Sequence, residues 1–176
     1  MRVGKVAAAV GVTAGVLGGG SVALAASHSK GGKVNVFITS QSPTTDKVLV
    51  TGAIGDYGTA VSQNAKGKVS PNGTYENVKL TRGGFIVNAT ELHNKLNHAK
   101  PVVNKANCSV MFRATGPAFI GDGSGAYKGI SGTVRITVIF AGVAPKTATG
   151  CNLGNNAPLH GSYHSATGTG TVKFVK

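Results

Sequence analysis

The segment Gly116–Thr133 reads GPAFIGDGSGAYKGISGT and is dense in glycine. A short apolar strand, Ala118–Ile120, leads into the acidic glycine turn Gly121–Gly125, and a long alternating strand follows Gly132. Glycines at this density do not pack a core, but they allow sharp turns at the rim of a barrel and close approach of neighbouring strands. A phosphate-binding loop is excluded, because neither a Lys-Ser/Thr pair nor a helix follows.

Apolar and polar residues alternate on both sides of this segment. Alternate positions from Cys108 to Ala114 are apolar, and the pattern resumes from Val134 to Phe140. A period of two predicts strands with one buried face. Several such runs, about 8–12 residues apart and separated by glycines, predict an all-β sandwich or barrel.

Two local signals add detail to this pattern. Pro71-Asn72-Gly73 predicts a hairpin within 67–80, because Asn-Gly accepts the positive φ values of a tight turn. The segment 90–100 predicts one short helix, with Thr90 as its N-cap and an end before Pro101.

A second glycine stretch, Val48–Val61 (VLVTGAIGDYGTAV), has the spacing of a dinucleotide-binding turn. Such a turn requires a helix directly after it and an acidic residue about 20 positions further on. Here the following residues lack a helical pattern, and Glu76 lies in a strand-like segment after a turn. We therefore expect no cofactor, and we expect Gly52 and Gly55 to bend a strand.

The glycine-rich segment resembles the barrel shared by allene oxide cyclases and dirigent proteins. In that family a Gly-Pro strand leads into a G-x-G-x-[YF] turn, and Gly116-Pro117, Gly123, Gly125, Tyr127 and Gly132 stand at matching places. Small exported actinobacterial proteins of unassigned activity share the pattern, and VLVTGAIGDYG is similar to their early strand. The resemblance implies an eight-stranded antiparallel barrel with an apolar interior. Plant members are often trimeric, which makes a homo-oligomer an expectation to test.

The N-terminus has the features of a secretory signal peptide. Arg2 and Lys5 precede the apolar run Val6–Leu17, and Ala23-Leu24-Ala25 supplies an A-x-A cleavage pattern. This predicts a secreted, extracellular protein with no membrane span after cleavage, because the apolar run is short for a bilayer. The expected division is residues 1–26 as signal peptide, 27–33 as flexible leader and 34–176 as a single barrel domain.

Two cysteines, Cys108 and Cys151, remain in the exported chain. In an oxidising compartment an even count predicts a disulfide rather than a catalytic thiol.

The chain is strongly basic. Without Arg2 and Lys5, 16 basic side chains stand against 5 acidic ones, a net charge of about +11. Such a charge favours anionic surfaces, including cell-wall polymers. The basic residues are scattered singly and no aromatic-rich basic motif is present, so we expect no specific nucleic-acid site.

The resemblance implies that pocket carboxylates, arginines and tyrosines carry any chemistry. Asp46 and Asp56 are the early-strand carboxylates, but each lies beside turn residues, so we expect both at surface turns. Arg113 and Arg135 fall on the face opposite the apolar alternation and should point outward, unless the barrel has a polar lumen. The candidate ligand contacts are Asp56, Tyr57, Arg113 and Tyr127.

The histidines do not predict a metal site. His160 and His164 are four residues apart, but Gly161 and Ser162 disfavour a helix, and in a strand such positions lie more than about 10 Å apart. A zinc site would also require a third protein ligand.

These observations favour an extracellular barrel that binds a small apolar or amphipathic ligand, without an assigned activity. An eight-stranded barrel is wide enough for one such ligand. We expect a binding protein rather than an enzyme. One alternative is an isomerase, or a dirigent-type protein that guides stereochemistry. Another is a cationic surface protein that binds cell-wall polyanions.

Overall fold

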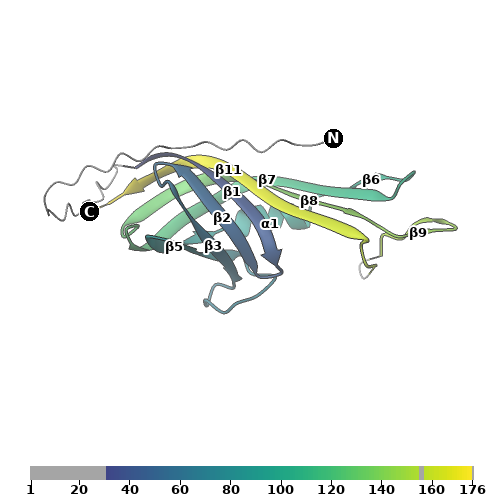
Figure 1. Cartoon of the computed structure of the whole chain (residues 1–176), viewed down its shortest axis with the longest axis horizontal. Coiled ribbons are helices and arrows are strands. Elements are labelled where there is room, and N and C mark those ends of the chain that lie inside the picture. The colour runs from purple at the N-terminus through teal and green to yellow at the C-terminus, as the bar shows by residue number, and fades with distance from the viewer. Residues whose placement is uncertain (1–30, 155–156, 176) are drawn as a thin grey trace, which may run out of the picture.

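The computed structural model describes residues 31–154 and 157–175, and Figure 1 shows their arrangement. The predicted signal peptide lies outside the described residues, and the first strand begins at Gly32, inside the predicted leader. The elements are β1 (Gly32–Ser42), β2 (Thr45–Gly52), β3 (Asp56–Gln63), β4 (Tyr75–Leu80), β5 (Gly83–Asn88), α1 (Thr90–Asn97), β6 (Val102–Asn104), β7 (Ser109–Gly125), β8 (Ile130–Val143), β9 (Lys146–Thr147), β10 (Gly150–Cys151) and β11 (Gly161–Phe174).

Eight of the strands form a closed antiparallel barrel, as the sequence predicts. The hydrogen-bonded order is β5-β4-β3-β2-β1-β11-β8-β7, and pairing of β5 with β7 closes the ring. The first and last barrel strands are neighbours, since Gly32 pairs with Val172. Within the closed ring these strands have no free edge, the usual point of aggregation in open sheets.

The inward face of the barrel follows the alternation of the sequence. In β1, for example, Val34 and Val36 are buried while Lys33 and Asn35 are exposed. Each fully buried side chain of this size contributes about 1.5–3 kcal/mol relative to exposure. The core also includes Val48, Val50, Ala60, Val78, Phe85, Val87, Ile120, Val134, Ile136, Val138, Ala166 and Val172.

The antiparallel order gives the barrel two distinct ends. One end, which we call the helix end, contains the end of β1, the start of β2 and the helix α1. The opposite end, which we call the network end, contains the start of β3 and the β4–β5 and β7–β8 turns.

Helix α1 packs on the inner face of β7, beyond the end of β5. A Cβ atom at Gly116 of β7 would lie only 3.0 Å from the Leu92 Cα, so glycine allows this close contact. The predicted helix is confirmed, but its N-cap is Ala89, without a side-chain cap. Thr90 is the first helical residue, and its hydroxyl bonds to that of Thr74 instead.

Strands β7, β8 and β11 are longer than the other barrel strands and extend past the helix end, towards the right of Figure 1. The extension includes the pairs Ser109–Val143 and Gly161–Val143. The predicted disulfide between Cys108 and Cys151 is confirmed; it lies beside this extension, and its Cα atoms are 5.3 Å apart. It links the start of β7 to the short β9–β10 hairpin.

The stretch Val48–Val61 belongs to β2 and β3, and no helix follows it. Gly52 and Gly55 have φ values of +81° and +56°, which allow the sharp bend between the two strands. The two glycines therefore turn the chain between two paired strands, and the expectation that they bend a single strand is wrong.

The hairpin predicted around Pro71–Gly73 is wrong. Strand β4 pairs with β3, and a long loop connects them. Val69 makes only an isolated bridge to Gln63 and is 56% exposed, so this segment has no buried face that would hold it in the sheet.

No helix in the described part of the chain is both long enough and apolar enough to cross a membrane.

Candidate functional site

The barrel encloses an apolar cavity of about 160 Å³. A dry cavity of about 150 Å³ lined by aliphatic and aromatic side chains holds a molecule the size of benzene. The apolar lining comes from the strands and from α1: Val34, Val36, Ile38, Val48, Val50, Ile54, Ala60, Val78, Phe85, Val87, Ala89, Leu92, Leu96, Ile120, Val134, Ile136, Val138 and Ala166.

The polar lining groups gather at the helix end. Ser40 lies at the end of β1, and Asp46 and Glu76 lie at the starts of β2 and β4. Both carboxylates precede an inward-facing valine by two residues, Val48 and Val78 respectively, so the pleat of the strand turns them towards the interior.

Glu76 is the least satisfied of these groups. Its Oε2 atom is shielded from solvent and has no hydrogen-bond partner among the described residues. Burial raises the pKa of the carboxyl to about 7, and the negative charge of Asp46 acts in the same direction. A hydrogen bond with the Ser62 side chain offsets part of this rise. Near neutral pH the carboxyl is therefore close to half protonated and can donate or accept a proton.

Two histidines complete the polar end. His93 of α1 lines the cavity, and burial lowers the pKa of its imidazole, which favours the neutral form. His164 of β11 also lines the cavity but is exposed, and its ring lies 6.3 Å from that of Phe140. These residues mark the helix end as the polar end of the cavity.

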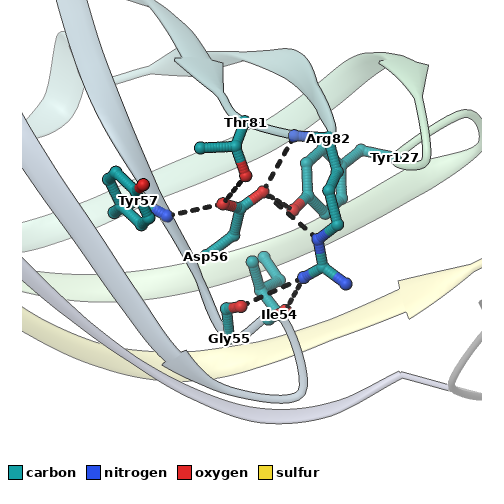
Figure 2. A network of polar contacts seen from close by, with 7 residues as sticks. All are labelled: Ile54, Gly55, Asp56, Tyr57, Thr81, Arg82 and Tyr127. Atoms are coloured by element: carbon teal, nitrogen blue, oxygen red, sulfur yellow. Dashed lines mark hydrogen bonds and ion pairs between the residues drawn. The ribbon is translucent and has the colours of Figure 1, made fainter. Parts of the chain in front are cut away.

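A second polar cluster lies at the network end and is centred on Asp56 (Figure 2). Asp56 Oδ1 accepts hydrogen bonds from the Thr81 hydroxyl at 2.5 Å and the Tyr57 backbone N–H at 2.7 Å. Asp56 Oδ2 accepts from the Tyr127 hydroxyl, the Arg82 backbone N–H at 3.2 Å and Arg82 Nε at 3.4 Å. One carboxylate thus joins the start of β3 to the β4–β5 and β7–β8 turns.

The hydrogen bonds and charges of this cluster indicate a structural role. Burial alone would raise the pKa of Asp56, but hydrogen bonds from Thr81, Tyr127 and two backbone N–H groups outweigh it and hold the pKa well below its usual range. Burial, together with the hydrogen bond to Asp56 and its charge, raises the pKa of Tyr127 to about 12. Both oxygens of the carboxylate already have donors, so the cluster offers little capacity for a ligand.

The four candidate ligand contacts fall in different places. Asp56 and Tyr127 are brought together and are buried, which shows that the expected surface position of Asp56 is wrong. The Tyr57 side chain is 65% exposed, and only its backbone N–H contacts the carboxylate. Arg113 is exposed on the outer face of β7, as the alternation predicts. None of the four lines the cavity, and their part in ligand binding stays a prediction.

The sequence interpretation missed Glu76 and misplaced Asp46. Asp46 was expected at a surface turn, but it lines the cavity. The sequence does contain an indication of this position. Each carboxylate lies an even number of residues from the buried valines of its own strand, and so on the same face of that strand. An acidic residue that falls on the same face of a strand as the apolar residues is expected to face the interior.

No group of three or more metal-ligating side chains occurs in the residues that the structure describes. The Nδ1 atom of His98 is instead 2.7 Å from the Asn94 carbonyl, within its own helix.

Fold and site together define an antiparallel, eight-stranded, up-and-down β-barrel with an apolar internal cavity and an acidic end. No family model, no curated protein and no solved structure matches the chain in the three comparisons.

Proposed function

We propose that this protein is an extracellular barrel that binds one small apolar or amphipathic molecule in its internal cavity. The observation that carries the proposal is the cavity itself, which is lined by aliphatic side chains and is large enough for a single ring. The signal-like N-terminus and the disulfide support an extracellular location. The barrel topology also supports the resemblance to allene oxide cyclases and dirigent proteins.

Cavity filling tests this proposal. Ala166 lines the cavity on β11, whereas the neighbouring Thr167 is exposed on the outer face. Cyclohexylmethanol is a suitable neutral probe, since its ring matches the cavity. We expect calorimetry to show binding to the wild type and to Thr167→Leu, and at least tenfold weaker binding to Ala166→Leu. No binding to the wild type, or equal binding to all three proteins, would exclude the cavity as the site.

The partly buried Glu76 carboxyl also supports the second candidate, an isomerase or a protein that guides stereochemistry. Glu76 titrates near neutral pH, as a general acid or base should. The lining residues that the structure describes include no tyrosine or arginine, which weakens the likeness to a dirigent pocket. Conversion of a bound probe that is abolished by Glu76→Gln would favour this candidate.

The third candidate, polyanion binding, rests on the net charge of +13, or about +11 without Arg2 and Lys5. Binding to an anionic polymer that disappears at high salt, without binding of the small probe, would favour it.

A further inference from the structure

The cavity lining includes acidic side chains, whereas the protein as a whole has a positive net charge. The chain has 5 acidic and 18 basic side chains, yet two of the five acids, Asp46 and Glu76, line the cavity. No lysine or arginine lines it in the described part of the chain. The cavity therefore carries acidic side chains and, among the described residues, no lysine or arginine to pair with them.

One oxygen of the Glu76 carboxyl, Oε2, also lacks a hydrogen-bond donor among the described residues. Buried polar atoms without a partner are rare in folded proteins, because each costs about 1–3 kcal/mol. The unpartnered Oε2 atom belongs to a side chain that lines the cavity, where the surrounding wall is largely aliphatic. A ligand donor placed beside this carboxyl would offer the hydrogen bond that the described residues do not.

We propose that the ligand is a small amphipathic cation, with an apolar body in the barrel and a protonated amine at the helix end beside Glu76 and Asp46. This inference rests on the proposed function and specifies its ligand class. An ammonium group donates up to three hydrogen bonds and offsets the repulsion between the two carboxylates. A neutral alcohol offers one donor and no charge, and a carboxylate would add a third negative charge.

Binding of such a ligand is coupled to a proton. The amine keeps its proton up to about pH 10, as lysine does, whereas Glu76 must lose its own to form the ion pair. Below pH 7 we therefore expect the affinity to fall up to about tenfold per pH unit, with proton release on binding. Asp46 of β2 and Ser62 of β3 act on the Glu76 carboxyl directly, and His93 of α1 and His164 of β11 line the same cavity.

The experiment compares three probes with one ring and different head groups: cyclohexylmethylamine, cyclohexylmethanol and cyclohexanecarboxylate. Calorimetry is performed at pH 5.5, 7 and 8, in buffers with different ionisation enthalpies. The variants are Glu76→Gln and the matched control Glu91→Gln, whose side chain is exposed on α1. Because protonation of His93 in acid would also weaken amine binding, the Glu76→Gln comparison isolates the carboxyl.

At pH 8 we expect the amine to bind the wild type and Glu91→Gln at least tenfold more tightly than the alcohol, and Glu76→Gln to lose that preference. Equal binding of amine and alcohol, tighter binding of the carboxylate, or an amine preference that survives Glu76→Gln would overturn the inference but leave the proposed cavity site intact. Binding of none of the probes would overturn both.

Discussion

Replacing Glu76 with glutamine should make the protein more stable at pH 8, although it removes a native side chain. The folded protein binds a proton at Glu76 more tightly than the unfolded chain does, because the pKa rises from 4.5 to about 7. Below pH 4.5 both states are protonated, so burial of the carboxyl has no ionisation cost. As the pH rises towards 7 the unfolded chain loses its proton first, and the wild type is progressively destabilised.

The expected size of this effect follows from the rise in pKa. One pKa unit corresponds to 1.36 kcal/mol, so a rise from 4.5 to about 7 corresponds to about 3 kcal/mol at pH 8. Glutamine has nearly the same shape and no charge, and it should not incur this cost. For a domain of this size, about 3 kcal/mol corresponds to a rise of about 6–12 °C in the melting temperature.

The assay is denaturant unfolding of the wild type and Glu76→Gln at intervals from pH 4 to pH 8. The difference between the two proteins isolates Glu76, because the other titrating groups contribute to both. We expect the difference in unfolding free energy to be close to zero at pH 4 and to grow to about 3 kcal/mol by pH 8. A difference that stays constant with pH, or a variant that is less stable at pH 8, would refute the assignment of Glu76 as a partly buried carboxyl with a raised pKa.

Two further predictions concern the network end and the disulfide. Asp56→Asn should destabilise the fold by about 3 kcal/mol in thermal or denaturant unfolding, because it weakens the charge-assisted hydrogen bonds that join the start of β3 to two turns. The exposed control Asp122→Asn should have little effect. The stabilisation from Asp56 should be fully present above its ordinary pKa of 3.8 and decline as the pH falls towards its lowered folded value; equal acid sensitivity of wild type and Asp56→Asn would contradict this. Replacing Cys108 and Cys151 together with alanine should cost up to about 4 kcal/mol, since the bond closes a loop with a sequence separation of 43; no change in unfolding free energy would contradict this estimate.

The barrel could be predicted because apolar and polar residues alternate along its strands and so identify the buried face of each strand. Alternation in β7 and β8 identifies the inward residues, and closure into a ring satisfies the edges that such strands would otherwise expose. The hairpin at Pro71–Gly73 failed for the converse reason. A turn signal was present, but the segment before it lacks buried positions to hold it against a neighbour.

The two polar ends were harder to predict, for different physical reasons. Asp56 is buried against Thr81 and Tyr127, which are 25 and 71 residues away. Contacts between residues so far apart leave no pattern in the local sequence. Asp46 and Glu76 did have a local signal, since they share the phase of the buried valines. The expectation that a charged residue beside a turn faces solvent led to the wrong prediction for Asp46.

The neighbouring positions of β1 and β11 affect how the protein can be handled. Gly32 and Val172 are paired, so the described chain enters and leaves the barrel side by side at the network end. A fusion partner or immobilising tag joined beyond either strand would extend from that end and leave the helix end accessible. The same adjacency permits a circular permutant in which a short linker joins the two strands and new termini open in the exposed loop between β3 and β4.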